Sequence, residues 1–342
     1  MGQAKAMRAH SYFYLTQFFS TSYNPSEEIL PIYTDPLQPN QPKSTTQQVF
    51  DLIISDLTDA VSLLETFQRT AKTEINKPVA QGILAYVYAY MGENGQAKTL
   101  TSDIINNAGF PIMDSTEVVF QGDPSVGGFN SVTTPGWMWG VDLTLDNGLD
   151  LVSWWGQMDA YTYSYQWAGD RKAIDQGLYD AIPADDVRKG QFNADPSSGY
   201  YLVALNKFYD SGKTIGGQRN ITTDYVYMRV AEMYLLNAET AAKDGDEATA
   251  KASLKALVEK RMPDASYIDG LSGEQLLDEI YLQTRIEFFA EGKSYLALKR
   301  NEGTVVRGSN HLSFVGEPIP YNDPRLIFSI PQSEIQNNPF IN

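Results

Sequence analysis

The sequence contains no cysteine and only two histidines, His10 and His311, among its 342 residues. Without cysteine the chain forms no disulfide, performs no thiol chemistry and carries no lipid on a cysteine of the sequence as given. Two imidazoles cannot build a three-histidine zinc site, and a histidine-based triad would have to use one of these two residues. A Gly-rich phosphate loop of either standard spacing is missing as well. Several common enzyme classes are therefore disfavoured.

Positive charge and long apolar runs are also scarce. The chain has 26 Lys and Arg residues against 42 Asp and Glu residues, a formal net charge of −16. This balance argues against nucleic acid and anionic membrane surfaces as partners, because both attract basic patches. No apolar run reaches the roughly 20 residues that a membrane-spanning helix needs, and Met1 is not followed by a signal-peptide pattern. Hydrophobic residues still make up 42% of the chain, which suffices for one large domain or two.

The strongest helical pattern begins at Tyr225 and is densest over residues 229–246. Apolar residues recur at helical spacing along one predicted face: Tyr227, Val230, Ala231, Tyr234, Ala238, Ala241 and Ala242. The opposite face carries charged residues, which we expect to be its polar side: Arg229, Glu232, Glu239 and Lys243. Gly245 then suits the end of this helix, and Asp246 suits the cap of a second helix over about 247–261. Two helices joined by so short a turn predict an antiparallel hairpin.

The same hairpin pattern occurs earlier, between residues 78 and 107, with Gly92 and Gly95 at the turn. In both copies two alanines lie 12 residues apart, one in each helix: Ala85 with Ala97, and Ala238 with Ala250. Small residues at this offset are typical of tetratricopeptide repeats, where they lie between the paired helices. The sequence therefore predicts a mostly α-helical fold of tetratricopeptide-like helix pairs, separated by a large insertion.

Three further helices are expected. Apolar spacing predicts one over about 3–19 and one over about 46–65, while the proline-rich stretch 20–45 between them reads as irregular. Ser272 and Gln275 form a capping-box pattern that would open a long helix reaching about Arg300. Gly292 interrupts that helix and predicts close packing or a kink.

Several segments resemble the SusD/RagB-like nutrient-binding outer-membrane lipoproteins. They are RVAEMYLLNAE, the long-helix residues Arg285, Glu287, Glu291, Gly292, Lys299 and Arg300, the tail IPQSEIQNNPFIN (330–342) and the early GQAKAMRAHSYFYL. The resemblance implies a SusD-like fold and the capture of glycans at the cell surface, as a lid on a SusC-like TonB-dependent transporter. In full-length relatives a signal peptide, a lipid-bearing cysteine and further helical sequence precede the early helix. We therefore expect this chain to be an N-terminally shortened form of a lipid-anchored protein.

We expect three regions, integrated in one domain. Residues 1–109 form the first part of the helical scaffold, residues 110–224 a loop-rich insertion with the candidate ligand surface, and residues 225–342 the C-terminal part of the scaffold. An irregular stretch of this length inside a compact chain is usually functional.

Aromatic residues gather in the insertion, which holds all five tryptophans. Since the family binds mostly glycans, the candidate platforms for sugar rings are Trp137, Trp139, Trp154, Trp155, Tyr161, Tyr163, Tyr165 and Trp167. The alternative is that these rings form a small core for the insertion. If Trp154 and Trp155 lie in an extended segment, they point to opposite faces, and only one is a platform. Gly156 would open space beside Trp155.

Other chemistry is weakly indicated. Asp142, Asp146, Asn147, Gly148 and Asp150 loosely resemble a calcium loop, but the glycine is one position late and a turn fits better. Carboxylates such as Asp159, Asp170 and Asp175 could pair for glycoside hydrolysis, but any acidic protein offers such pairs, and the sequence does not give their separation. We expect no catalytic residue, no metal and no cofactor. The expected function is capture of oligosaccharides for import, and the alternatives are capture of peptides or a glycan-degrading enzyme on a helical scaffold.

Overall fold

The structure is a computed structural model that describes residues 1–123, 125–217 and 219–341. The α-helices are α1 (Gly2–Phe19), α2 (Thr46–Leu63), α3 (Lys77–Met91), α4 (Asn94–Asn107), α5 (Ser115–Val118), α6 (Trp154–Met158), α7 (Tyr165–Ala168), α8 (Gln176–Ala181), α9 (Val230–Lys243), α10 (Glu247–Val258), α11 (Gly273–Glu287), α12 (Lys293–Arg300) and α13 (Gln332–Asn337). The strands pair antiparallel as β1 (Glu28–Leu30) with β2 (Ser44–Thr45), β3 (Trp137–Val141) with β4 (Tyr225–Arg229), and β5 (Thr304–Val306) with β6 (Pro318–Pro320). The fold is mostly α-helical, as predicted.

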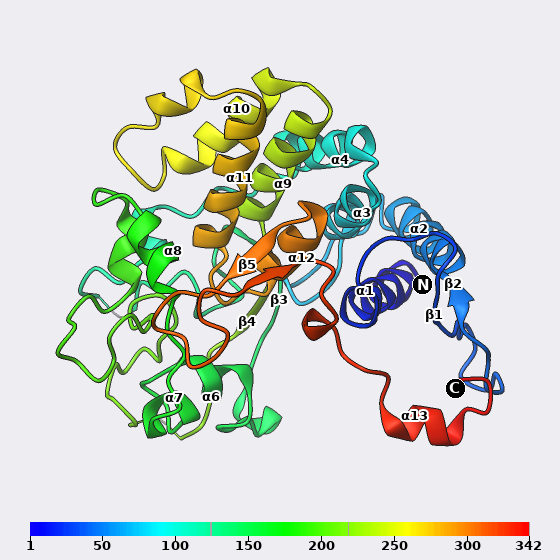
Figure 1. The fold of residues 1–342 in the computed structure, drawn as a ribbon, viewed down its shortest axis with the longest axis horizontal. Coiled ribbons are helices and arrows are strands. Elements are labelled where there is room, and N and C mark those ends of the chain that lie inside the picture. Colours follow the sequence, from blue (N-terminus) through cyan, green and yellow to red (C-terminus); the bar gives the residue numbers. More distant parts are fainter. Residues whose placement is uncertain (124, 218, 342) are drawn as a thin grey trace.

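The long helices form one continuous layer of neighbours. α1 packs on α2, α2 on α3 and α3 on α4, and α4 then packs on α9, which contacts α10 and α11. The two predicted hairpins, α3–α4 and α9–α10, are therefore stacked side by side although more than 100 residues separate them (Figure 1). The loop-rich segment that joins them lies against one side of this layer (Figure 1). The three-part division of the chain stays a prediction.

Local signals place both hairpins correctly. Gly92 and Gly245 follow α3 and α9 in the left-handed conformation, with φ of 82° and 81°, which glycine adopts without a steric penalty. Asp246 caps α10 by accepting the Thr249 N–H at 3.1 Å. The alanines at the predicted offset, Ala85 with Ala97 and Ala238 with Ala250, are all fully buried. None of the helices in the described ranges is both long and apolar enough to cross a membrane.

The predicted start of the helix that ends before Gly245 is wrong. Residues Tyr225–Arg229 form strand β4, and α9 begins only at Val230. Tyr227 is therefore 41% exposed on a strand instead of packing on a helical face. The partner strand β3 lies more than 80 residues earlier in the chain, so the local spacing of apolar residues contains no sign of it.

The prediction that the charged residues form a polar outer face of α9 is also wrong, because this face is buried. Arg229, Glu232 and Glu239 are each at most 2% exposed. Glu232 accepts the Tyr86 hydroxyl at 2.8 Å and pairs with Lys293 at 3.1 Å. The predicted pair of Glu239 with Lys243 is present at 3.0 Å. Charges on this face hold helices together instead of meeting solvent.

The long helix predicted over 272–300 is two helices. α11 ends at Glu287 and α12 begins at Lys293, and between them Ala290 and Gly292 have φ of 62° and 77°. Ser272 makes no capping hydrogen bond with its side chain, so the predicted capping box is absent. The break is larger than a kink, and it forms one wall of the cavity described next.

Candidate functional site

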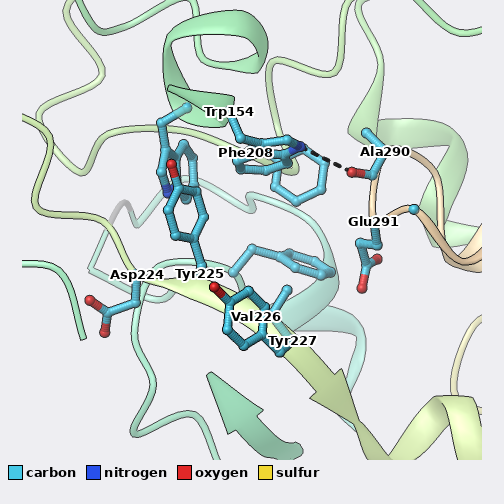
Figure 2. Close-up of a pocket in the computed structure, with 11 residues that line it drawn as sticks. Trp154, Phe208, Asp224, Tyr225, Val226, Tyr227, Ala290 and Glu291 are labelled. Atoms are coloured by element: carbon cyan, nitrogen blue, oxygen red, sulfur yellow. Dashed lines mark hydrogen bonds between the residues drawn. The ribbon is translucent and has the colours of Figure 1, made fainter. Parts of the chain in front are cut away.

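A cavity of about 460 Å³ opens between the helical layer and the loop-rich segment. Three parts of the chain surround it: strand β4, helix α6 and the break between α11 and α12 (Figure 2). Its lining is mainly aromatic and apolar, with two carboxylate residues: Phe129, Trp154, Trp155, Phe208, Asp224, Tyr225, Val226, Tyr227, Ala290, Glu291 and Gly292. A concave, mostly aromatic site with few polar groups is typical of small-ligand sites.

Strand β4 supplies the tyrosines of the cavity. It pairs with β3, Gly140 facing Val226 and Val141 facing Tyr225. A Cβ atom on Gly140 would lie 2.6 Å from the Tyr225 carbonyl oxygen, so only glycine permits this approach of the two strands. Asp224, just before the strand, accepts the backbone N–H groups of Val132 and Leu143 at 2.7 and 2.8 Å. Burial raises the pKa of the Asp224 carboxyl, and its two backbone bonds fix the loops behind β4.

Helix α6 supplies the tryptophan pair. Ser153 caps it by accepting the Gly156 N–H at 3.1 Å, so the doublet is helical and the expected extended segment is wrong. Trp155 is 1% exposed, whereas Trp154 is half-buried in the cavity wall. Gly156 opens no space beside the doublet, because a Cβ there would lie 2.3 Å from the Leu151 carbonyl oxygen.

The half-buried ring of Trp154 is held on several sides. Its centroid lies 4.8 Å from that of Phe208 and 6.0 Å from that of Tyr225, both in edge contacts. Its indole N–H donates to the Ala290 carbonyl at 3.2 Å, the dashed line in Figure 2. Ala290 has a left-handed backbone, which costs a non-glycine residue energy and points to a constrained site. The ring is therefore fixed in place before any ligand arrives.

A buried ion cluster holds the break between α11 and α12. Lys207 Nζ donates to the carbonyls of Glu287 and Phe289, both at 3.0 Å, and to Glu291 at 2.8 Å. Arg229 donates to the Glu287 carbonyl at 2.9 Å and to Glu291 at 2.7 and 2.9 Å. Cations at the C-terminal end of α11 donate hydrogen bonds to its last carbonyls and interact favourably with the negative end of the helix dipole. The Glu291 carboxylate is therefore fully engaged behind the cavity wall.

Glu287 is the centre of this cluster. It accepts Arg188 at 3.0 Å, Arg229 at 2.6 Å and Arg261 at 2.8 and 2.9 Å. Burial alone would raise the pKa of the Glu287 carboxyl, but the three guanidinium groups hold it well below its usual range. Asp186 completes the cluster by pairing with Arg188 at 2.5 Å. The cluster thus ties the loop-rich segment, which provides Asp186, Arg188 and Lys207, to the C-terminal part of the helical scaffold.

The predicted platform residues divide into three groups. Trp137, Trp139, Trp155 and Tyr161 are buried, at 0%, 3%, 1% and 7% exposure. Of the candidates, Trp154 is the one whose half-buried ring forms a cavity wall. The others do not line the cavity: Tyr163 and Tyr165 are 39% and 40% exposed, and Trp167 packs on Tyr163 with centroids 5.1 Å apart.

Sequence reasoning did not find the tyrosines Tyr225 and Tyr227 or the residues of the helix break. The alternation Tyr-Val-Tyr over residues 225–227 is a sequence pattern from which strand β4 could have been predicted. The ion cluster left no comparable signal, because its members come from separate parts of the chain. Such a cluster can be recognised only once the chain is folded.

The arrangement can bind but shows no reactive pair. Asp224 and Glu291 are both committed to fixed partners, and in the described ranges no group of three or more His, Asp or Glu side chains is placed to hold a metal ion. The calcium-like stretch is a turn, in which Thr144 N–H donates to Asn147 at 2.7 Å and Gly148 has φ of 60°. The hydroxyls of Tyr225 and Tyr227 make no hydrogen bond to any described residue, so both can bond to a ligand in the cavity.

Comparisons of the sequence and of the fold with known proteins point to the same family. Residues 185–342 match the sequence model of the SusD family, and residues 1–89 match a family model described as starch-binding associating with outer membrane. The fold is similar to that of a SusD-like carbohydrate binding protein from Bacteroides vulgatus ATCC 8482, with 26% identity, a TM-score of 0.77, and coverage of 99% of this chain and 76% of that chain. A SusD superfamily protein from Bacteroides thetaiotaomicron VPI-5482 gives 26% identity, a TM-score of 0.80, and coverage of 100% and 76%. The chain matches none of the curated proteins compared with it.

Proposed function

The chain belongs to the SusD family, and from this premise we propose that it captures oligosaccharides at the cell surface. It would hold them unchanged and pass them to a SusC-like TonB-dependent transporter in the outer membrane. The observation that carries this proposal is the aromatic cavity between β4, α6 and the helix break. The description of the family model for residues 1–89, which names starch and the outer membrane, supports the ligand class and the location.

The cavity offers what a sugar ring needs. Sugars present flat C–H faces, and covering on the order of 60 Å² of such a face with an aromatic ring gains roughly 1–2 kcal/mol. Trp154 and Tyr227 provide two such rings from different segments, and the tyrosine hydroxyls can bond to sugar hydroxyls. Two or three such contacts give millimolar to micromolar affinity, about −4 to −8 kcal/mol. The ring of Trp154 is held before binding, so little ordering opposes that gain.

The hydrogen-bond and ion-pair partners of the two cavity carboxylates favour binding over hydrolysis. Glycoside hydrolysis uses two carboxyl groups that flank the bond to be cleaved, one of which must deliver a proton. At this cavity Asp224 accepts two backbone N–H groups, and Glu291 is paired with Arg229 and Lys207. Neither is free to act as an acid or a nucleophile. This favours a non-catalytic role at this site.

Calorimetry with a panel of neutral oligosaccharides, starch fragments among them, and with peptides of similar size tests the proposal. We expect at least one oligosaccharide to bind and the peptides not to bind. Binding of peptides alone would show a peptide-capturing protein instead. Chromatography of the sugars after long incubation should show them intact, and shortened products would reveal an enzyme. Purification of the full-length protein from detergent-solubilised outer membranes should bring a SusC-like transporter with it, and recovery without any such transporter would count against this partner.

A further inference from the structure

A row of aromatic rings leads away from the cavity at Tyr227. The ring of Tyr227 packs on that of Trp139 with centroids 4.9 Å apart, and Trp139 packs in turn on His10 at 5.1 Å. On α1, His10, Tyr14 and Phe18 follow one another at intervals of four residues, with neighbouring centroids 4.7 and 5.9 Å apart. Because side chains four residues apart lie on one face of a helix, the row continues along α1.

The far end of the row is Phe328, in the C-terminal segment that passes beside α1 (Figure 1). The centroid of Phe328 is 5.8 Å from that of Phe18, and its backbone N–H donates to the Phe18 carbonyl at 2.8 Å. Tyr295 stacks on the ring of Phe18 with centroids 6.1 Å apart. Its hydroxyl donates to the carbonyls of Gln17 and Leu326, both at 2.8 Å. The C-terminal segment is therefore fixed against α1, with Phe328 at the end of the row.

Most rings of this row are open to solvent. Tyr227 and Phe328, at its two ends, are 41% and 65% exposed. Trp139 is 3% exposed and supports the row from the core. The remaining rings are half-buried: His10, Tyr14 and Phe18. Aromatic surface that a ligand can reach therefore continues outside the cavity.

Tyr227 joins the row to the cavity. It lines the cavity and also a small neighbouring pocket whose walls include His10 and Tyr14. Lys293 Nζ donates to the Tyr227 carbonyl at 2.8 Å and to the Tyr14 hydroxyl at 3.4 Å, which ties β4 to α1 at this point. A ligand that leaves the cavity over Tyr227 therefore meets the rings of α1 next.

The chemistry of the row suits a long neutral sugar chain. Burial and the charge of Lys293 lower the pKa of His10 to about 4, so its imidazole is neutral at pH 7. Sugar units that cover aromatic rings gain free energy by burying apolar C–H surface, and a row of rings offers this gain to several units of one chain. We propose that the row extends the binding site, so that a starch chain too long for the cavity lies along α1 from Tyr227 to Phe328. This extension rests on the proposed function, because the chain must first occupy the cavity.

Calorimetry with maltotriose and maltodecaose tests this extension, because the shorter sugar can occupy the cavity alone, whereas the longer one also reaches the row. Phe328→Ala removes the far end of the row. Phe340→Ala is the matched control, since Phe340 is 58% exposed and lies outside the row. Because both side chains are mostly exposed, both variants should melt with the parent protein.

We expect the parent protein and Phe340→Ala to bind maltodecaose at least about tenfold more tightly than maltotriose. Phe328→Ala should bind maltodecaose about fivefold more weakly than the parent protein does, and maltotriose equally well. A longer chain also gains affinity by offering more registers, but this gain is the same in both variants. Equal affinity of Phe328→Ala and Phe340→Ala for maltodecaose would overturn the extension and leave the cavity site intact. Binding of neither sugar would overturn the extension together with starch as the ligand of the cavity.

Discussion

Replacing Glu287 with glutamine should destabilise the fold more than any surface change, because Glu287 lies at the centre of the buried ion cluster. Within the described residues the cluster holds four cations, Arg188, Lys207, Arg229 and Arg261, and three carboxylates, Asp186, Glu287 and Glu291. Glu287→Gln would leave four cations with two carboxylates. The Glu287 carboxylate accepts four hydrogen bonds from arginines. In glutamine an NH2 group, which can only donate, would replace one of its two accepting oxygens.

The expected cost follows from this count. Removing one partner of a buried ion pair costs about 3–5 kcal/mol, because it leaves a charge uncompensated. For a chain whose total stability is on the order of 10 kcal/mol, this is a large fraction. With a urea dependence of about 3 kcal/mol per molar, the midpoint should fall by about 1 M or more. The wall of the cavity at Ala290 should loosen as well.

Urea denaturation at pH 7, followed by tryptophan fluorescence, measures this change. Asp278→Asn is the matched control, because Asp278 lies on the same helix, is exposed and forms no ion pair within the described ranges. It should shift stability by no more than about 0.5 kcal/mol. A loss below about 1 kcal/mol for Glu287→Gln would refute the view that this cluster holds the helix break.

Three further predictions concern packing, pH and the sheet. Ala238→Leu should overpack the α9–α10 contact and cost roughly 1–3 kcal/mol, whereas Ala248→Leu on the exposed side of α10 should not; equal midpoints would contradict the placement. Burial raises the pKa of the Asp159 carboxyl to about 7 from 3.8, so its contribution to stability falls as the pH rises between these values. Asp159→Asn should abolish that part of the pH profile of thermal unfolding, and an unaltered profile would argue against it. Gly140→Ala should lower the melting temperature, since its Cβ would lie 2.6 Å from the Tyr225 carbonyl oxygen; an unchanged value would rule out the close strand approach.

The helical layer could be predicted from the sequence because its signals are local. Alanine spacing within each hairpin, Gly245 after α9 and Asp246 before α10 all act over a few residues. Each of them would favour the same structure in an isolated segment, so they can be found without knowing the partners.

The helix break and strand β4 depend on distant partners. Lys207 and Arg229 reach the end of α11 from 80 and 58 residues away in sequence, and they satisfy carbonyls that a continuous helix would have used internally. Likewise, Tyr225–Arg229 has enough helical spacing to mislead, and only pairing with β3 makes it a strand. Tertiary contacts here override the local preference.

The candidate site could be located only to a region. Composition indicated that the aromatic segment matters, but it could not distinguish Trp137, which donates to the Gly128 carbonyl in the core, from Trp154 at the cavity. In the sequence, both tryptophans lie in an irregular segment with glycines nearby. Exposure depends on which elements cover each ring, and that depends on the whole fold.

The central claim is that the cavity between β4, α6 and the helix break holds the sugar. A crystal structure of the protein with a starch oligosaccharide, combined with calorimetry on Tyr227→Ala and Tyr165→Ala, tests it most directly. These tyrosines are 41% and 40% exposed, but only Tyr227 lines the cavity. The account predicts a sugar ring on Trp154 and Tyr227, with affinity about tenfold weaker in Tyr227→Ala and unchanged in Tyr165→Ala. A sugar bound on Tyr163 and Tyr165, with the affinity loss in Tyr165→Ala instead, would contradict it.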